Sequence, residues 1–454
     1  MVAGALIQII SSIGEQDLYL TGDPQISIFK TVYKRHTNFA VETISEIFNN
    51  ACDFGKTARC VIPRRGDLLS NIALEINIGS LNPEFTDQVA LGSNILHMAS
   101  ADCVCSNCLK SLLADNVNYG WANALGHVLI ESSWIEIGGR KIDEQYGEWL
   151  EIWSELTQTQ EKRMGYNQMI GKVDYPAFKA TTFPGSANLY VPLNFWFCKN
   201  YGLALPIVAL YYQDVELVVK FREFEGCWVS TTAGIAAPKR PKFDARILID
   251  NIYLGLDERR QFYTQSNIYL IEQHQNHSDD EIRSTTANIN LYFNHPVKEI
   301  IWLLQRSDVT GPANGVYSTS GYPIGNDWYN YSTFPNRNTG IIQDTFEYGK
   351  ILVNGSDRFS AQRAAYFRLL QPYYYHTRIP TNYIYTYSFS LKPEELQPTG
   401  QLNFSMVENV KILLSMPRDL SIAEQVSYIF RAYVVNYNVL YITSGMGSLL
   451  FNNR

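Results

Sequence analysis

The chain has 454 residues and a formal net charge of −7, with 46% hydrophobic and 18% charged residues. This composition excludes a disordered chain, and the acidic balance argues against direct packaging of nucleic acid, because phosphate neutralisation requires a basic surface or arm. The length allows two domains, and the 13% aromatic share favours strands over helices. No stretch is long and apolar enough for a transmembrane helix, and no basic segment precedes the apolar first ten residues, so we expect no signal peptide.

Residues 1–26 are predicted to form an amino-terminal arm outside the first core. They mix apolar and polar residues without a full strand pattern. Gly22 and Pro24 predict a turn, because glycine frees the backbone and proline presets its own φ. An extended segment is expected to follow, with Ile26 and Ile28 on one side. The basic cluster at 30–36 is interpreted as a solvated or interface strand end.

The first half of the chain predicts strands joined by one clear helix. Residues 68–78 alternate between apolar and polar positions, as a strand with one buried face does, and residues 215–221 repeat the pattern. Residues 128–143 predict a hairpin that turns at Gly138–Gly139. A helix is expected from near Tyr146, with an apolar stripe that we interpret as packing against a sheet: Trp149, Ile152, Trp153 and Leu156.

The second half repeats the order of the first. Each half has an alternating strand, then a long insertion, then an aromatic strand and a second alternating strand. In the first half these are residues 68–78, 79–126, 195–197 and 215–221, and in the second half 297–304, 306–345, 385–389 and 410–416. Residues 226–242 are rich in small residues and proline and predict a linker. The prediction is therefore an all-β chain with two tandem eight-stranded antiparallel jelly rolls, residues 27–225 and 243–454, with long insertions and few short helices.

Motifs of the best-marked enzyme classes are missing from the sequence, which contains no P-loop, HExxH or GxSxG. Cys103, Cys105 and Cys108, with His97 nearby, have spacings that zinc accepts. We favour a loop of reduced thiols, and the metal alternative stays open. The other four cysteines are expected to serve as small core residues rather than as a disulfide framework: Cys52, Cys60, Cys198 and Cys227.

Two polar groups offer further alternatives. His274 and His277, followed by Asp279 and Asp280, are possible metal ligands, but we interpret them as an exposed polar turn. The adjacent carboxylates Glu394 and Glu395 suggest glycoside chemistry, which needs two carboxylates at a set separation, yet their position between prolines favours a loop. Four sequons are present and are expected to be unused: Asn276, Asn330, Asn354 and Asn403. We predict no catalytic residue, no metal site and no cofactor.

Nine blocks, in order along the chain, resemble the major capsid proteins of large nucleocytoplasmic double-stranded DNA viruses, such as chlorella viruses, iridoviruses and marseilleviruses. They span residues 17–39, 64–69 (RRGDLL), 138–156, 203–210 (LALPIVAL), 257–260 (DERR), 295–302, 371–376 (QPYYYH), 385–404 and 436–447. Each block alone is weak evidence for the family, but the occurrence of all nine in the family's order is highly specific.

The resemblance implies a double jelly-roll structural protein rather than an enzyme. It implies a homotrimeric, pseudo-hexagonal capsomer in an icosahedral shell, assembled in the host cytoplasm. Its implied partners are neighbouring capsomers, minor capsid and penton proteins and the inner membrane side of the shell, with no direct contact to nucleic acid. The long insertions are expected to face outward and the arm inward. The alternative from another class is a carbohydrate-binding or glycan-processing β-sandwich, which requires a groove with aromatics and paired carboxylates.

Overall fold

The computed structural model describes residues 23–81, 119–173, 186–230, 238–307, 309, 316–317, 323–333, 343–417 and 427–451. The chain divides into two units, residues 1–39 and residues 40–454. In the first unit, the described residues before Phe39 form neither helix nor strand, and Ile28 and Phe29 are 90% and 99% exposed. The extended segment predicted from Ile26 is interrupted by a turn at 28–30, where Lys30 N donates to Ser27 O.

The first sandwich consists of two four-stranded sheets. One sheet has the order β1 (Phe39–Ile47), β10 (Phe243–Leu254), β3 (Leu68–Ile78) and β7 (Ala187–Pro192). The other has the order β2 (Thr57–Val61), β8 (Val215–Phe221), β5 (Ile130–Ile137) and β6 (Arg140–Tyr146). The alternation predicted for 68–78 and 215–221 is confirmed, because every second residue of β3 and β8 is buried. The hairpin is also confirmed, with Gly138 and Gly139 at φ 58° and 77°, although its first strand begins only at Ile130.

The pairing of β10 corrects the expected linker at 226–242. Its antiparallel register with β3 runs from Phe243↔Ile78 to Ile252↔Leu68, so β10 belongs to the first sandwich rather than opening the second. The expected linker also contains β9 (Trp228–Ser230), and Cys227 is fully buried. The small residues and prolines of 226–242 have the local composition of a linker. The first sheet nevertheless needs β10 between β1 and β3, so the first sandwich extends beyond this segment.

The second sandwich repeats this topology. Its first sheet has β11 (Asn267–Ile282), β22 (Tyr428–Thr443), β13 (Pro296–Arg306) and β19 (Tyr385–Ser388), with β20 (Leu402–Asn403) and β23 (Met446–Leu449) at its margins. Its second sheet has β12 (Thr286–Leu291), β21 (Val410–Ser415), β16 (Tyr348–Val353) and β17 (Ser356–Asp357), with β18 (Gln362–Arg363) beside β16. When the eight main strands are counted in chain order, both sandwiches read 1-8-3-6 and 2-7-4-5. That shared order is a double jelly roll, as predicted.

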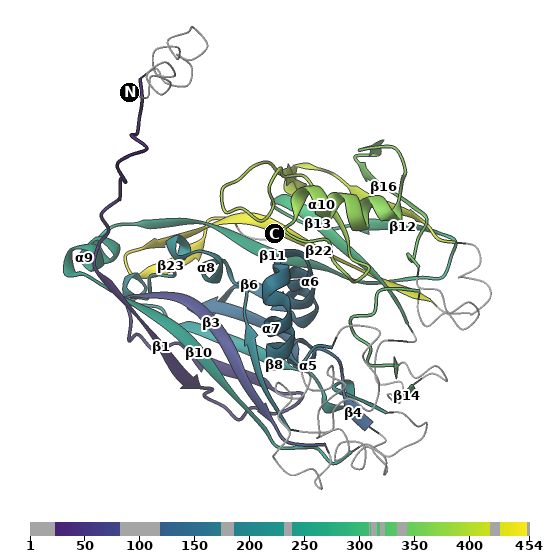
Figure 1. Ribbon diagram of the computed structural model, residues 1–454, viewed down its shortest axis with the longest axis horizontal. Helices are drawn as coiled ribbons and strands as arrows, with labels where there is room; N and C mark the ends of the chain where they lie inside the picture. The colour runs from purple at the N-terminus through teal and green to yellow at the C-terminus, as the bar shows by residue number, and fades with distance from the viewer. Residues whose placement is uncertain are drawn as a thin grey trace, which may run out of the picture. The chain divides into compact units, whose positions relative to one another are not determined.

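Helices decorate the sandwiches (Figure 1). They are α5 (Leu125–Leu129), α6 (Gly147–Thr157), α7 (Gln160–Ile170), α8 (Trp196–Lys199), α9 (Leu256–Thr264) and α10 (Gln371–Tyr375), with short turns at η2 (Tyr201–Leu203), η3 (Ile207–Ala209), η4 (Phe224–Gly226), η5 (Tyr366–Leu370) and η6 (Phe404–Met406). The helix predicted near Tyr146 is confirmed as α6, and its four apolar stripe residues are buried. The aromatic strand predicted at 195–197 is wrong, because Trp196 and Phe197 open α8. Three consecutive aromatics carry no alternation, and burial of all three is what decides the local backbone.

A small sheet joins the margins of the two long insertions. Its order is β15 (Pro323–Ile324), β14 (Val316–Tyr317), β9 and β4 (Tyr119–Trp121). Strand β14 from the second half pairs in parallel with β9, and β4 pairs with the other edge of β9. Figure 1 shows β4 and β14 well away from α9, near the opposite ends of the first sandwich's strands. Most of residues 79–126 and 306–345 lie outside the described residues.

Each sandwich encloses an apolar core. The first contains Leu74, Leu217 and Phe221, and the second contains Trp302, Phe367 and Ile412. As predicted for the cysteines, Cys60 and Cys227 are buried, and Cys52 and Cys198 pack against the first core. Burial raises the pKa of the Cys198 and Cys227 thiols to about 12, which keeps them protonated and unreactive at neutral pH.

Candidate functional site

The two sandwiches meet along the sheet that contains β13 and β22. Strand β13 is buried on both faces: Trp302 points into the second core, whereas Ile301 and Leu303 join the first. Strand β22 behaves in the same way, with Val434 in the second core and Val435 in the first. The two sandwiches therefore pack against each other through a shared apolar interior and are not connected by a linker alone. We call the contact region the junction, defined by α6, β6 and α8 of the first sandwich and β11, β13, β22 and residues 376–394 of the second.

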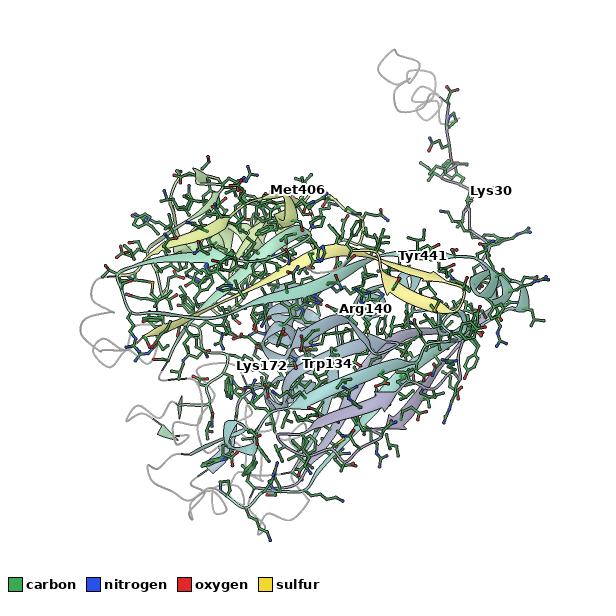
Figure 2. The ribbon with its side chains drawn as sticks, turned by 180° about the vertical axis from the view of Figure 1, so that it is seen from behind. Lys30, Trp134, Arg140, Lys172, Met406 and Tyr441 are labelled. Atoms are coloured by element: carbon green, nitrogen blue, oxygen red, sulfur yellow. The ribbon has the colours of Figure 1, made fainter. Side chains whose placement is uncertain are left out.

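Helix α6 brings carboxylates into the junction. Glu148, Glu151 and Glu155 follow helical spacing, and Glu151 and Glu155 are almost completely buried. Lys172 Nζ lies 2.5 Å from both Glu151 Oε1 and Glu155 Oε1, and His127 Nδ1 lies 2.8 Å from Glu151 Oε2. A buried charge of this kind is tolerated only when it is paired and hydrogen-bonded. Figure 2, seen from behind, labels Lys172 among these elements and Met406 on the second sandwich.

Glu155 connects this cluster to the second sandwich. Its Oε2 accepts from Arg378 Nη2 at 2.5 Å and from the backbone N–H of Thr381 at 3.0 Å. Burial alone would raise the pKa of Glu155, but the positive charges of Lys172 and Arg378 lower it to about 2. The carboxylate is therefore charged at all physiological pH values, and it holds residues 378–381 against α6.

A second charge cluster surrounds Glu272 of β11. Lys199 from α8 contacts its Oε2 at 2.7 Å, and Lys298 from β13 bonds to its Oε1 and to the carbonyl of Pro393. Burial would raise the pKa of Glu272, and the two lysines lower it to about 2. Because Lys199 belongs to the first sandwich and Glu272 to the second, this cluster also bridges the junction.

His274 corrects the predicted exposed turn. It lies within strand β11, its side chain is 1% exposed, and its Nδ1 lies 3.0 Å from Asp143 Oδ2 of β6. Its ring packs 4.7 Å from that of Trp149. His277 instead faces Phe293 and Phe430 of the second core. Residues an odd number of positions apart on a strand point to opposite faces, so these histidines do not form a metal site together.

Glu148 of α6 bonds to side chains of β22 and so forms another contact across the junction. Its carboxylate accepts from Tyr433 Oη at 2.5 Å and from Tyr331 Oη at 3.2 Å, and Arg431 Nε lies 3.2 Å from it. Burial, followed by the nearby Glu148 charge, raises the pKa of both tyrosines far above 10, so both remain donors. This group adds directional bonds between α6 and the eighth strand of the second sandwich.

His376 forms a charge cluster within the second sandwich, and it also corrects the interpretation of Glu394. His376 Nε2 lies 3.2 Å from Glu299 Oε2, and its Nδ1 lies 3.1 Å from Glu394 Oε1. Burial would lower the pKa of His376, but these two carboxylates raise it to about 9. Glu394 does lie in a loop, as predicted, yet it is a half-buried ion-pair partner there. Its neighbour Glu395 pairs with Lys392 instead, so the two do not act as a catalytic carboxylate pair.

The remaining sequence candidates are the cysteine loop and the sequons. Cys103, Cys105, Cys108 and His97 lie outside the described residues. Within the described ranges, no group of three or more His, Cys, Asp or Glu side chains has the geometry to hold a metal ion. No helix in the same ranges has the length and apolar character to cross a membrane. Among the sequons, Asn330 is buried, Asn354 occupies a turn at φ 49° and Asn403 caps η6.

Sequence reasoning missed the junction, although a signal was present. Glu272 directly follows the apolar run 268–271, and Lys298 and Glu299 interrupt the apolar run 296–304. Such residues at core-facing positions require partners from elsewhere in the fold, because an unpaired buried charge is too costly. The partners lie far away in sequence, so the pairs were not visible before the structure.

Two capsid families match the chain in tandem. The family described as major capsid protein N-terminus matches residues 27–255, and the family described as large eukaryotic DNA virus major capsid protein matches residues 258–448. The matches meet just after β10, in agreement with the sheet pairing.

Three curated relatives match over their full length. The chain is 35% identical to the major capsid protein of Pyramimonas orientalis virus, 34% to that of Phaeocystis pouchetii virus and 30% to that of Paramecium bursaria Chlorella virus 1, with 100% of each chain covered. In structure, it resembles the PBCV-1 capsid protein with a TM-score of 0.72 at 26% identity, covering 94% of this chain and 100% of that chain. The Faustovirus major capsid protein shares the fold, with a TM-score of 0.69 at 13% identity over 95% and 94% of the two chains.

Proposed function

The chain belongs to the major capsid proteins of large eukaryotic DNA viruses and is a structural subunit of the capsid shell, and we propose that it works as a homotrimer. Three copies in a closed ring would present six similar sandwiches, a pseudo-hexagonal capsomer able to tile an icosahedral shell. We propose that neighbouring capsomers, minor capsid and penton proteins and the membrane side of the shell are its partners, and that assembly takes place in the host cytoplasm.

The junction is the observation that carries this proposal. A pseudo-hexagon requires the two sandwiches of each subunit to keep one fixed relation, since any hinge between them would break the equivalence of six positions. Both sandwiches share one strand order, and the junction joins them by a common interior and buried ion pairs. Glu394 and Glu395, the adjacent carboxylates that suggested glycan processing, bond to different partners, His376 and Lys392.

Size-exclusion chromatography with light scattering tests the trimer. We expect the purified protein to have three times the chain mass, and we expect a glycan array to show no binding. Arg378→Glu reverses the charge beside Glu155 and should reduce the trimer fraction, whereas Arg283→Glu, at an exposed pair, should leave it unchanged. A monomer of wild-type protein that binds a glycan would overturn the proposal.

The orientation within the particle is a separate part of the proposal. Long insertions between strands emerge at the ends of a sandwich, and the margins of both insertions meet in the sheet of β4, β9 and β14. We propose that residues 79–126 and 306–345 form the outer surface and that the arm faces the particle interior. Limited proteolysis of intact particles should cut within 306–345 before it cuts the arm. Cleavage in the reverse order would reverse the orientation.

The arm is proposed to act in assembly rather than in folding. Deletion of residues 2–20 should leave a soluble trimer and impair shell formation in an in vitro assembly reaction followed by electron microscopy. Ile28 and Phe29, which directly follow the arm, support this, because both apolar side chains are exposed. Loss of soluble trimer on deletion, to the extent seen with a core mutant, would contradict the proposal.

A further inference from the structure

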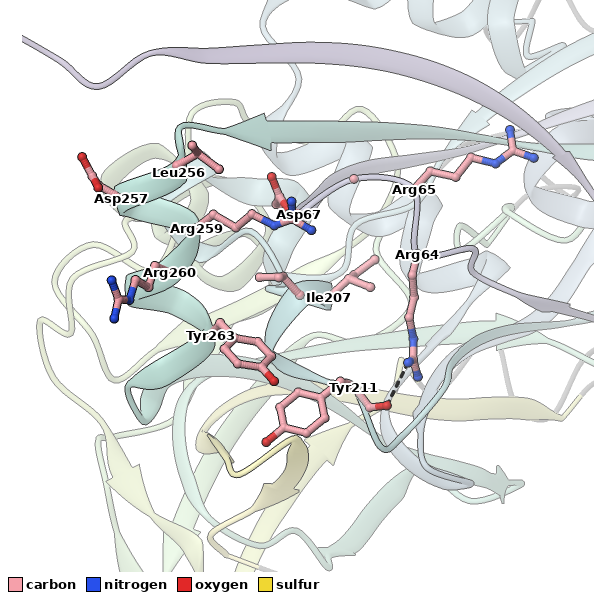
Figure 3. A pocket seen from close by; sticks show the side chains of 12 residues that line it. Arg64, Arg65, Asp67, Ile207, Tyr211, Leu256, Asp257, Arg259, Arg260 and Tyr263 are labelled. Carbon is pink, nitrogen blue, oxygen red and sulfur yellow. Dashed lines mark hydrogen bonds and ion pairs between the residues drawn. The ribbon is translucent and has the colours of Figure 1, made fainter.

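A pocket of about 620 Å³ lies beside α9, and three distant segments of the chain build it (Figure 3). Residues 64–67 precede β3, residues 207–211 include η3, and residues 256–263 belong to α9. Each segment overlaps a sequence block by which the chain resembles its family. We call this hollow the α9 pocket.

Helix α9 has little packing of its own. It has nine residues, none of them buried, and Leu256 and Tyr263 are 84% and 52% exposed. A helix this short is marginal in water without tertiary contacts. A few contacts hold it, among them an ion pair and an apolar contact: Arg259 Nε lies 2.9 Å from Asp67 Oδ1, and Phe262 packs against a small cluster that includes Leu68. The helix therefore presents most of its side chains to solvent rather than to the core.

The floor and one wall of the pocket are apolar and aromatic. Ile207 is 2% exposed and forms the floor. The ring of Tyr211 lies 5.1 Å from that of Tyr263 and 4.5 Å from that of Tyr212, which is 74% exposed. Figure 3 shows Tyr211 and Tyr263 side by side below Ile207. Exposed aromatic surface that continues into a hollow is typical of a protein-binding site.

The lining carries positive charge on a chain whose net charge is −7. Four arginines and two aspartates line the pocket. The arginines do not converge on one point: Arg64 bonds to the Tyr211 carbonyl and pairs with Asp214, Arg65 pairs with Glu46, and Arg259 pairs with Asp67. The four guanidinium groups therefore do not form a binding site for a single phosphate group. Arg260 is exposed, and no carboxylate of the described residues lies within ion-pair distance of its guanidinium.

We propose that the α9 pocket binds an acidic peptide segment of another protein. An apolar side chain of that segment would enter between Tyr211 and Tyr263, and its carboxylates would lie along the spread arginines, with Arg260 the strongest because no intramolecular pair competes. The inference rests on the proposed function only in taking the partner to be another particle protein.

Fluorescence anisotropy with the purified full chain tests the proposal. The probe is a fluorescein-labelled dodecapeptide of alternating glutamate and leucine, and the control probe replaces glutamate with lysine. We expect the acidic peptide to bind about tenfold more tightly, and Arg260→Glu to weaken it about tenfold, with less weakening as salt is raised. Tyr263→Ala should also weaken binding. Arg283→Glu, an exposed arginine of the second sandwich, is the matched control and should have no effect.

Each other outcome would overturn the inference. Equal binding of both peptides, or unchanged binding by Arg260→Glu, would remove the charge argument. Arg260-dependent binding of phosphatidylserine vesicles without peptide binding would identify a membrane surface instead. Arg260-dependent growth of the oligomer in light scattering would identify a second copy of the chain. Thermal unfolding of every variant checks the fold, and a trimer without peptide binding would reject this inference while leaving the proposed function intact.

Discussion

The interiors of the two sandwiches and the junction between them are built by different chemistry. Each sandwich interior is almost purely apolar, as Leu217 and Ile412 illustrate. The junction has apolar contacts as well, but it also buries Glu151, Glu155 and Glu272 with their lysine and arginine partners. Apolar burial is nondirectional and supplies stability, whereas buried ion pairs contribute less net stability and impose geometry. The comparison indicates that the cores hold each sandwich together and the junction sets their relative position.

The largest effect is expected when a junction charge loses its partner. Lys172→Met leaves Glu151 and Glu155 adjacent and buried, and we expect the free energy of unfolding to fall by about 3–5 kcal/mol. Urea denaturation measures this. Lys220→Met is the matched control, because Lys220 also lies 2.5 Å from a carboxylate, that of Glu131, but both side chains are substantially exposed. It should cost less than about 1 kcal/mol. Equal losses would show that burial does not distinguish the junction.

Core truncation should come next. Leu217→Ala in the first sandwich and Ile412→Ala in the second each remove buried methyl groups and leave a cavity, at a cost of about 2–5 kcal/mol. Leu413→Ala is the control on the same strand, because its side chain points to the other face and is only partly buried. Chemical denaturation compares the three variants. Similar losses for Ile412 and Leu413 would contradict the assignment of the core face.

The pH dependence of stability tests the His376 cluster, which lies on the second-sandwich side of the junction. The pKa of His376 is raised from 6.5 to about 9 in the folded protein, so its contribution is fully present below about pH 6.5 and is lost as the pH rises through 9. The shift corresponds to a contribution on the order of 3 kcal/mol. Unfolding measured at pH 6 and pH 10 should show a loss in wild type that is smaller in His376→Gln. A loss of the same size in both would assign the pH dependence to other groups.

Exposed ion pairs give the smallest effect. Arg283 pairs with Glu281 at 2.9 Å, but the two side chains are 77% and 46% exposed. Arg283→Ala should therefore change stability by less than about 1 kcal/mol, and added salt should reduce the difference further. Thermal unfolding at low and high salt measures it. A loss as large as that of Lys172→Met would erase the contrast between junction and surface.

The parts of the fold that depend on local pattern were predictable. Alternation predicted β3, β8 and β21, a glycine pair predicted the hairpin turn, and helical spacing predicted α6. The boundary between the sandwiches was not predictable from local pattern. Strand β10 is assigned to the first sandwich only by its pairing with β3, which is a long-range contact. The three aromatic residues 195–197 likewise show no helical or strand periodicity, so the sequence did not predict α8 there. Local pattern fixes what an element is, and tertiary pairing fixes where it belongs.

The functional residues divide in the same way. The family resemblance identified a shell protein, but it did not indicate which side chains hold the two sandwiches together. His274 looked like part of an exposed turn because polar residues surround it in sequence, yet its partner Asp143 lies 131 positions away. Glu394 was placed correctly in a loop, but its bond to His376 required the fold. Charged residues within apolar strands were the available signal, and they identify one half of each pair.

The position of the eighth strand orders the events of biosynthesis. In both sandwiches it lies between the first and third strands, so neither sheet can close until that strand has left the ribosome. The first sandwich can close after residue 254, but the second must wait for β22, which ends at Thr443. Throughout that interval the first sandwich exposes its junction face to water. Glu148 and Glu155 lack their second-sandwich partners, Tyr433 and Arg378, during that interval. We expect their carboxylates to keep the face hydrated until the second half arrives.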